Sequence, residues 1–359
     1  MDIRRATTEF EKWLRRTTPV DPSGLAKKHK LMAESKFAFL RATYYRWMQL
    51  WEEECSSLHD APRVLSVGDL HIDNFGTWRD LEGRLVWGVN DFDEVTELPY
   101  THDLLRLATS ALLALDEGSL RIKPKAACMA ILSGYQDGIK SGGRPFVLAE
   151  DNPWLFNIAL TQLKNPSRFW DKLSSWQKLP KARLPKDVRA LFDEHLPKGY
   201  KDYIVVLREA GLGSRGQQRF VALAEIGNSY VAREAKALRP SAANWALKTR
   251  DHNIHYERVL ASSVRVCDPH VHVYPNWLLR RLAPDCTRIE LESFPQKGNE
   301  QKLLYAMGFE TANIHLGGGN ASEKIRKDLK SRGRRWLLES ARIMKKRTQQ
   351  DWSAWNKSV

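Results

Sequence analysis

Two acidic segments near each other in the chain carry side chains that suit phosphoryl transfer. They are Gly68–Gly76 (GDLHIDNFG), which holds Asp69 and Asn74, and Val89–Glu94 (VNDFDE), which holds Asp91. Mg²⁺ prefers oxygen ligands, of which protein supplies one or two beside the substrate phosphates. Phosphoryl transfer also needs a carboxylate that orients or deprotonates the acceptor hydroxyl. The sequence therefore predicts Asp69 as the catalytic base, with Asn74 and Asp91 as magnesium ligands.

A glycine-rich segment, Gly211–Gly216, lies far downstream and has the form GxGxxG. A dinucleotide-binding domain would need a helix directly after the third glycine, but the following Arg219–Ala224 is strand-like. A glycine loop between two strands suits a loop that folds over the phosphates of ATP. The residues expected to contact the nucleotide are Gly211, Gly213, Ser214 and Gly216.

The next strand-like segment, Ser229–Ala237, offers two cations for those phosphates. Arg233 and Lys236 occupy odd and even positions, so they face opposite sides of a regular strand. Only one of them can point into a binding cleft, and the other is expected to be a solvated cation.

A metal hydrolase is an alternative interpretation of the first acidic segment. Asp69, His71 and Asp73 alternate, and on a strand they would share one face and could bind a catalytic metal. Gly68 and the Asn-Phe-Gly sequence after these residues favour a loop instead. A set of ordinary polar loop residues is the third interpretation.

Composition limits the class of protein. The chain has 359 residues, 42% of them hydrophobic and 28% charged, which suits two folded domains or lobes and excludes a disordered chain. Its net charge of +14 favours phosphates and nucleotides as partners; nucleic acid fits the charge but is not favoured. No apolar run reaches the roughly 18 residues of a membrane span, so no membrane partner is expected. The four cysteines form no CxxC pair, which fits a cytoplasmic protein.

The elements that position these residues follow from apolar spacing. Residues 1–60 are expected to be helical, residues 150–200 to be a partly helical connection rich in Trp, Lys and Pro, and the chain after Ala237 to be mostly helical. A basic amphipathic helix is predicted over Lys324–Lys346 and is expected to pack on its own domain. The remaining predictions are a helix over Thr101–Leu115 and strands over Arg63–Val67, Phe75–Trp78, Arg84–Val89, Tyr203–Leu207, Arg219–Glu225 and Ser229–Ala237.

The two acidic segments resemble the catalytic and metal-binding loops of the protein-kinase-like superfamily, especially its aminoglycoside and choline phosphotransferase branch. There the loops read Gly-Asp-Leu-His-x-x-Asn and Ile-Asp-Phe-Asp. Pro99–Leu105 resembles the start of the helix after the metal loop, whose Asp103 would brace the catalytic loop through backbone hydrogen bonds. One departure is Val67, where these enzymes usually have His.

In this resemblance the order of the motifs is reversed, because a kinase places its glycine loop before its catalytic loop. The fold class expected is therefore α+β, a protein-kinase-like two-lobed fold with circularly permuted lobes. Residues 1–150 and 291–359 would form a mainly helical large lobe. Residues 201–290 would form a β-rich small lobe, and residues 151–200 would connect them.

The chain also resembles a bacterial family of uncharacterised proteins, domain of unknown function 2252. The resemblance covers most of the chain and includes Gly68–Gly76 and Arg233-Glu234-Ala235, where the family usually has Lys-Glu-Ala. That makes Arg233 the first choice for the phosphate cation and Lys236 the second. Glu257 is a weaker candidate partner of that cation, and Arg288–Glu292 is a candidate hinge strand.

The function expected is ATP- and magnesium-dependent phosphoryl transfer to a hydroxyl group of an acceptor that the sequence does not identify. A nucleotide-binding pseudoenzyme and a nucleotidyltransferase using the same cleft remain open, and a metal hydrolase is less favoured.

Overall fold

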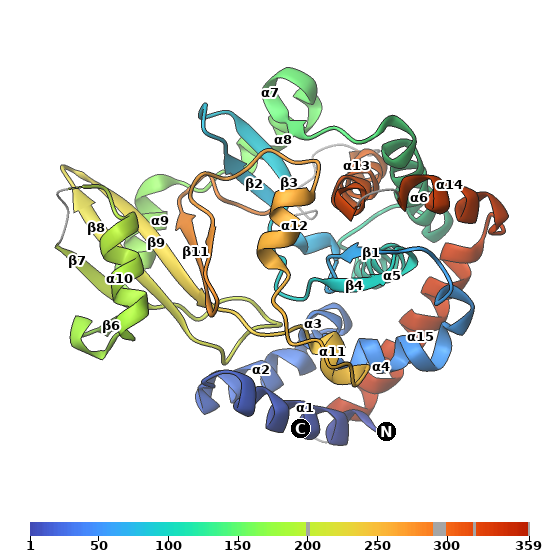
Figure 1. The fold of residues 1–359 in the computed structure, drawn as a ribbon, viewed down its shortest axis with the longest axis horizontal. Helices are drawn as coiled ribbons and strands as arrows, with labels where there is room; N and C mark the ends of the chain where they lie inside the picture. The colour runs from blue at the N-terminus through green and yellow to red at the C-terminus, as the bar shows by residue number, and fades with distance from the viewer. Residues whose placement is uncertain (199–201, 290–298, 319–320, 358–359) are drawn as a thin grey trace.

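The computed structural model describes residues 1–198, 202–289, 299–318 and 321–357, and it has a mixed α+β fold (Figure 1). The class expected from the sequence is confirmed at this level. Its helices are α1 (Ile3–Thr17), α2 (Pro22–Glu34), α3 (Lys36–Ala42), α4 (Tyr44–Glu54), α5 (Thr101–Asp116), α6 (Pro124–Ser141), α7 (Leu148–Asp151), α8 (Pro153–Gln162), α9 (Pro166–Ser174), α10 (Lys186–His195), α11 (Ala242–Ala246), α12 (Tyr256–Ser262), α13 (Asn299–His315), α14 (Ala321–Ser331) and α15 (Trp336–Asn356). Short 3₁₀ turns are η1 (Ser56–Leu58), η2 (Ile72–Asn74), η3 (Lys181–Arg183) and η5 (Leu316–Gly318).

The strands form three sheets. A six-stranded antiparallel sheet has the order β10-β11-β9-β8-β7-β6, a three-stranded sheet has the order β2-β3-β5, and β1 pairs with β4. The strands are β1 (Arg63–Ser66), β2 (Phe75–Arg79), β3 (Leu85–Val89), β4 (Thr96–Pro99), β5 (Phe146–Val147), β6 (Lys178–Leu179), β7 (Tyr203–Leu207), β8 (Arg219–Ile226), β9 (Ser229–Ala237), β10 (His272–Val273) and β11 (Trp277–Leu282).

The six-stranded sheet is covered by nearby helices on both faces. Val188 and Phe192 of α10 pack against alternate residues such as Phe220 and Ala222, and Leu173 of α9 packs against Val221 on the other face. This alternation follows from the period of two along a strand. Part of the segment expected to connect the two halves therefore packs directly on the sheet.

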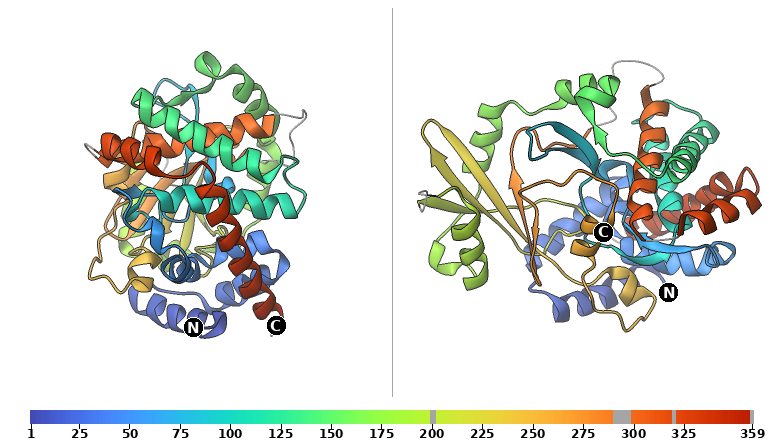
Figure 2. Two further views of the ribbon diagram at one scale, coloured as in Figure 1. Left: turned by 90° about the vertical axis from the view of Figure 1, so that its right-hand side faces the viewer. Right: turned by 45° about the horizontal axis from the view of Figure 1, so that its top comes forward.

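The larger part of the molecule is mainly helical and contains both ends of the chain. Helix α5 runs through its centre and is buried from Thr101 to Ala114. Ile3 and Met32 pack with Trp355 of α15, so the first and last helices share one apolar cluster. The two termini both lie at the bottom of the molecule in Figure 1 and in the left view of Figure 2.

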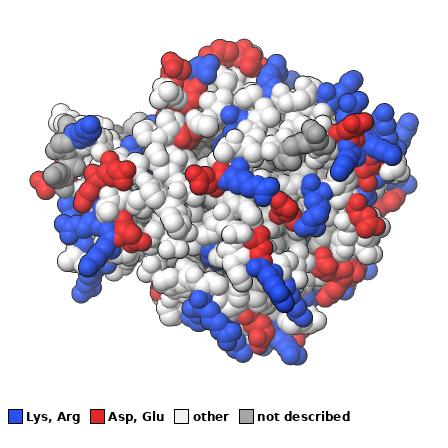
Figure 3. All heavy atoms as spheres, in the orientation of Figure 1, with Lys and Arg blue, Asp and Glu red and all other residues white. Residues whose placement is uncertain are grey.

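Basic and acidic side chains alternate over the face shown in Figure 3, so the positive charge is not gathered there into a single patch. Among the described residues, none of the helices combines the length and the apolar character needed to cross a membrane.

One prediction about secondary structure was wrong. The helix expected over Lys324–Lys346 is divided into α14 and α15 around Gly333, where Arg332 folds back onto Asp328 with a 2.6 Å ion pair. The described chain after Ala237 is mostly helical, as expected, but its first part also adds β11, which pairs with β9 along its whole length, and β10, which extends the sheet. The hinge strand expected over Arg288–Glu292 lies partly outside the described residues; Arg288 makes an isolated bridge with Gly76.

Candidate functional site

One cavity of about 350 Å³ brings together the two acidic segments and the glycine loop. The residues of the sequence-predicted site that line it are Asp69, Asn74, Asp91, Gly211, Gly213 and Ser214. Gly216 and Arg233 are not among the lining residues in the described part of the chain. Lys236 is also not among these lining residues, but its Nζ lies 3.1 Å from Oδ1 of Asp91, which lines the cavity.

The loop that carries Asp69 is fixed by a buried carboxylate of α5. Strand β1 ends at Ser66, and the backbone N–H groups of Val67 and Gly68 then donate to Asp103 at 2.7 and 3.0 Å. Gly68 has a φ of +81°, and a Cβ there would lie 2.3 Å from the carbonyl oxygen of Glu94, so only glycine fits this turn. The bracing role predicted for Asp103 is confirmed.

Asp103 also accepts hydrogen bonds from two histidines. His102 Nδ1 lies 3.3 Å and His315 Nε2 lies 2.9 Å from its carboxylate, and all three side chains are fully buried. Burial raises the pKa of Asp103, but the hydrogen bonds from His102 and His315 outweigh burial and hold the pKa below its ordinary value. His315, at the end of α13, therefore helps to hold the carboxylate that braces the loop. Val67 contributes only its backbone N–H group to this bracing.

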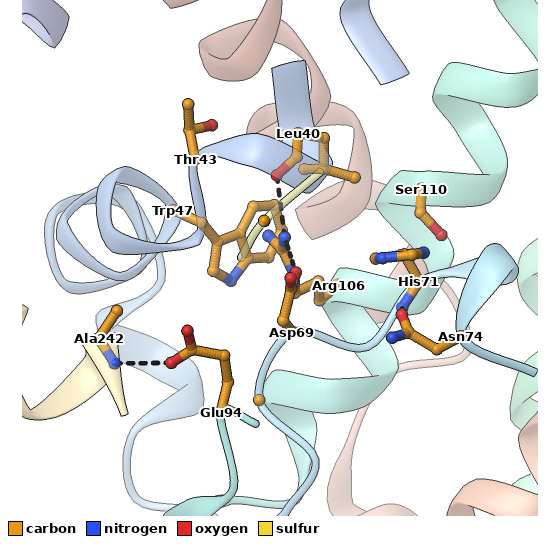
Figure 4. A network of polar contacts seen from close by, with 12 residues as sticks. Leu40, Thr43, Trp47, Asp69, His71, Asn74, Glu94, Arg106, Ser110 and Ala242 are labelled. Carbon is orange, nitrogen blue, oxygen red and sulfur yellow. Dashed lines mark hydrogen bonds and ion pairs between the residues drawn. The ribbon is translucent and has the colours of Figure 1, made fainter. Parts of the chain in front are cut away.

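Asp69 is held at one oxygen and open at the other (Figure 4). Arg106 Nε donates to Asp69 Oδ1 at 2.8 Å, and its Nη2 donates to that oxygen and to the carbonyl of Leu40. The guanidinium lies 4.9 Å from the ring centroids of both Tyr44 and Trp47. Within the described chain, Oδ2 has no recorded hydrogen-bond partner. It faces Gly213, where a Cβ would lie 3.4 Å away.

The environment of Asp69 changes its acidity. Burial raises its pKa to about 7, and the positive charge of Arg106 opposes that rise. A pKa near the working pH is the most effective value for a general base. Asp69 therefore combines a free oxygen with the acidity that proton transfer near neutrality requires.

Asn74 ends a tight turn and joins the two acidic loops. Its Oδ1 accepts from the backbone N–H of His71 at 2.8 Å, and its backbone carbonyl accepts from Asn90 N–H at 3.0 Å. His71 Nδ1 in turn accepts from Asp73 N–H at 3.2 Å. The segment is a loop and a 3₁₀ turn, so Asp69, His71 and Asp73 do not share a strand face as the hydrolase interpretation required.

Lys236 joins the six-stranded sheet to the loop after β3. Its Nζ lies 3.1 Å from Asp91 Oδ1 and also contacts Asp93, while its own side chain is only 1% exposed. Burial raises the pKa of Asp91, but Lys236 and Arg280 outweigh burial and lower it. Burial and the neighbouring Asp91 raise the pKa of Asp93 to about 6.

These carboxylates suit a magnesium ion that is shared with a ligand. Asp93 Oδ1 is buried and has no hydrogen-bond partner among the described residues, which leaves a hard oxygen free to coordinate. No group of three or more His, Cys, Asp or Glu side chains in the described chain could hold a metal by itself. Magnesium commonly completes its coordination with phosphate oxygens and water, so the set fits when phosphates are present.

The glycine loop is held over Asp69 by α2. Lys28 Nζ donates to the carbonyl of Gly213 at 2.9 Å, and Asp21 N–H donates to the carbonyl of Gly216 at 2.7 Å. A Cβ on Gly24 would lie 2.7 Å from the Cα of Gly216, so the two backbones are in direct contact. Burial and the nearby Arg239 lower the pKa of Lys28 to about 8.

A cluster of arginines around Glu234 extends the site along the sheet. Arg208 Nη1 and Arg280 Nε each lie 2.6 Å from the Glu234 carboxylate, and Arg219 Nη1 lies 3.5 Å from it. Glu234 and Lys236 share one face of β9. Arg233 lies on the other face, with its Nη2 3.3 Å from His270 Nδ1.

Several residues of the site were missed in the sequence. Asp93 could have been found as the second carboxylate of Asp-Phe-Asp. Arg106, Lys28 and the arginines around Glu234 gave no local signal, because their partners lie far away in the sequence. Glu257 is exposed on α12, and Lys236 contacts Asp91 and Asp93 instead of this residue.

Comparison with known proteins places the chain in a family. The model of a family described as an uncharacterized protein conserved in bacteria, DUF2252, matches residues 20–153 and 148–358. The chain belongs to this family. No curated protein and no solved structure matches it.

Proposed function

We propose that this protein is a kinase-like phosphotransferase that moves the terminal phosphoryl group of ATP to a hydroxyl group of an acceptor, with the help of magnesium. The observation that carries the proposal is the position of Asp69. Its free Oδ2 faces Gly213 of the glycine loop in the cavity that also holds Asp91. A base, a phosphate-covering loop and metal-binding oxygens are the parts that phosphoryl transfer requires.

The connectivity of the sheet supports a kinase-like small lobe. The glycine loop joins β7 to β8, and Lys236 lies on β9, the third strand of that meander. In protein kinases the phosphate-binding lysine lies on strand β3, the strand that follows the two strands joined by the glycine loop. This position favours Lys236 over Arg233 as the phosphate cation, although Arg233 was the first choice from the family resemblance.

The packing of the two ends supports a permuted lobe order. The shared cluster of Ile3, Met32 and Trp355 joins helices from both ends of the chain into one part of the molecule. Permutation is tolerated when termini lie close together at the surface. A large lobe built from both ends, with the β-rich lobe inserted between them, accounts for the reversed motif order.

In the proposed reaction the acceptor oxygen attacks the terminal phosphorus. The new O–P bond forms as the bridging P–O bond breaks, the electron pair of that bond stays on the leaving ADP, and Asp69 Oδ2 takes the hydroxyl proton. Arg106 holds Asp69 in place through its other oxygen. Asn74, Asp91 and Asp93 are the residues that would hold magnesium, which neutralises phosphate charge when it is bound. The backbone of the glycine loop and Lys236 orient the phosphates.

A nucleotide-binding pseudoenzyme is the second candidate, and one observation favours it. Arg106 forms a buried ion pair with Asp69 and so opposes the rise in pKa that burial causes. If Asp69 serves mainly as the partner of this arginine, the protein would bind a nucleotide and magnesium without turnover.

The test is to replace Asp69 by Asn, which keeps its size and removes its charge. Transfer of the γ-phosphate to water, to the protein itself and to a panel of hydroxyl compounds is measured by mass spectrometry, which also detects nucleotidylated products. Turnover should fall by about a hundred- to ten-thousand-fold. The affinity for ATP with magnesium, measured by calorimetry, should stay nearly constant.

The matched control is Asp60→Asn, an exposed carboxylate shortly before β1. It should turn over like wild type. Equal turnover in wild type and Asp69→Asn would exclude Asp69 as the base. Binding of ATP by both proteins without any transfer would favour the pseudoenzyme.

A further inference from the structure

The sheet side of the cavity is strongly charged, whereas the aromatic lining residues Trp78, Phe92 and Tyr256 come from other elements. Of the four residues that the six-stranded sheet contributes to the described lining, three are arginines, Arg219, Arg280 and Arg281, and the fourth is Leu282. Pockets for small organic molecules are lined mainly by apolar and aromatic side chains. This wall is therefore poorly suited to hold a flat base and well suited to hold an anion.

The charges of this wall are not balanced by its own carboxylates. Glu234 is fully buried and pairs with three arginines, so these four side chains carry a net charge of +2, which the neighbouring carboxylate of Asp91 offsets only in part. Over the whole lining, eight arginines and one lysine face six carboxylates. Buried charge without a counter-charge is costly, so the cluster favours an anionic ligand.

Unused hydrogen-bond donors point to the same ligand. The Nε atoms of Arg208 and Arg219 are buried without a hydrogen-bond partner among the described residues, as are Nε and Nη1 of Arg265, which also lines the cavity. Guanidinium groups bind phosphate oxygens with strong, directional hydrogen bonds. A chain of phosphates presents many such oxygens, whereas a purine base presents few.

We infer that the phosphate donor is held through its phosphates and that its base contributes little, so that an inorganic polyphosphate occupies the same site as ATP. This inference rests on the proposed phosphotransferase function and names the donor class for it. With a polyphosphate donor, the acceptor oxygen bonds to the terminal phosphorus and the bridging P–O bond breaks. The electron pair stays on the shortened chain, and the proton goes to Asp69.

Calorimetric titration of the full chain, in the presence of magnesium, tests this inference with ATP, GTP, inorganic tripolyphosphate and adenosine. The three polyphosphate ligands should bind with dissociation constants within about tenfold of one another. Adenosine should not bind measurably. Tripolyphosphate should also displace ATP in competition.

A charge-matched pair of variants localises the effect. Arg208→Gln removes one cation of the Glu234 cluster, and Arg258→Gln removes a cation that is 54% exposed, pairs with Glu97 and lies outside the described cavity lining. Arg208→Gln should weaken all three polyphosphate ligands by a similar factor of about ten. Arg258→Gln should change them less than twofold.

The possible results separate this inference from the proposed function. Binding of ATP more than a hundredfold tighter than GTP and tripolyphosphate, or measurable binding of adenosine, would overturn the inference and leave phosphotransfer from ATP in place. An unchanged affinity of Arg208→Gln for tripolyphosphate would also overturn it. Failure of every phosphate ligand to bind would overturn both. If Arg208→Gln does not fold, the wild-type ligand series still decides.

Discussion

Opposite walls of the cavity are held in place by different kinds of contact. On the wall that carries Asp69, the carboxylate of Asp103 accepts four hydrogen bonds from fully buried groups of the loop, α5 and α13. The glycine loop is tied to α2 by Lys28 and Asp21, and just before the loop Glu209 forms an ion pair with Lys27 in which the side chains are 50% and 52% exposed. Exposed ion pairs contribute little to stability, whereas a buried network is costly to disturb.

This difference suggests that the two walls have different roles. The loop that carries Asp69 is held by buried contacts within the protein, which suits the proposed base, since a base must lie within hydrogen-bond reach of its proton. The glycine loop lies close against Asp69 and is attached in part through exposed side chains, so we expect it to move when a donor enters. We call the wall that carries Asp69 the rigid wall and the wall formed by the glycine loop the movable wall. We expect substitutions to have the largest effect in the rigid wall, a smaller effect at Lys236 between the walls, and the smallest effect in the movable wall.

The largest effect is expected at the centre of the rigid wall. Asp103→Asn replaces two acceptor oxygens by one acceptor and one donor, so at least one buried donor loses its partner. The free energy of unfolding, measured by urea denaturation at pH 7, should fall by about 3 kcal/mol. Because the pKa of Asp103 lies below its ordinary 3.8, its stabilisation is present above pH 4 and is lost as the pH falls through the lowered pKa.

Asp116→Asn, at the exposed end of the same helix, is the control for Asp103→Asn. Its ion pair with Lys345 is partly exposed, so the loss should stay below about 1 kcal/mol. Equal losses in the two variants would show that Asp103 does not brace the loop that carries Asp69.

The second effect is expected at the cation that joins the walls. Lys236→Gln should weaken binding of ATP with magnesium by about ten- to a hundredfold, because a buried charge-assisted contact to phosphate is lost. Arg233→Gln, three residues away on the opposite face of β9, should change it less than twofold. Calorimetric titration of both variants gives the comparison. A larger loss in Arg233→Gln would restore the assignment suggested by the family resemblance.

The third effect is a pH dependence of turnover. In the proposed reaction Asp69 acts as a base only when it is ionised, and burial raises its pKa to about 7. Turnover should therefore be full above pH 8 and fall by about tenfold per pH unit below pH 7. Arg106→Gln removes the charge that opposes the rise in pKa, so the midpoint of the profile should move to more alkaline pH. A profile that is flat between pH 6 and 8 in wild type would contradict this role for Asp69.

The structure of the rigid wall was easier to predict from the sequence than that of the movable wall. Asp69, Asn74 and Asp91 fall within a short stretch of chain, so local spacing was enough to predict their meeting. Asp103, on the next helix, was identified from the resemblance to the kinase-like loops. The strands Arg63–Val67 and Ser229–Ala237 were also predicted nearly to their ends. Local patterns succeed where the residues that act together are neighbours in the sequence.

The movable wall and the arginine cluster of the neighbouring sheet could be predicted only in part. The glycine loop was visible as a motif, but the cluster around Glu234 draws Arg208, Arg219 and Arg280 from separate strands, and only the register of the sheet brings them together. The same holds for Arg106, whose partner Asp69 lies on another element. Strand β11 escaped prediction because its pairing with β9 spans a long intervening segment.

The smallest effect is expected where α2 meets the glycine loop. Gly24→Ala places a Cβ 2.7 Å from the backbone of Gly216, so one of the two segments must shift. Alanine in a helix ordinarily adds about 0.5–1 kcal/mol of stability relative to glycine. Here the overlap should reverse that sign and lower the free energy of unfolding by about 1 kcal/mol. Turnover should fall several-fold, because the loop is displaced from Asp69.

Gly333→Ala, where a Cβ meets no atom within 4 Å, is the control for Gly24→Ala and should leave the free energy of unfolding and the turnover nearly unchanged. A stabilising effect of Gly24→Ala would mean that the loop yields freely, and α2 would then not set its position over Asp69.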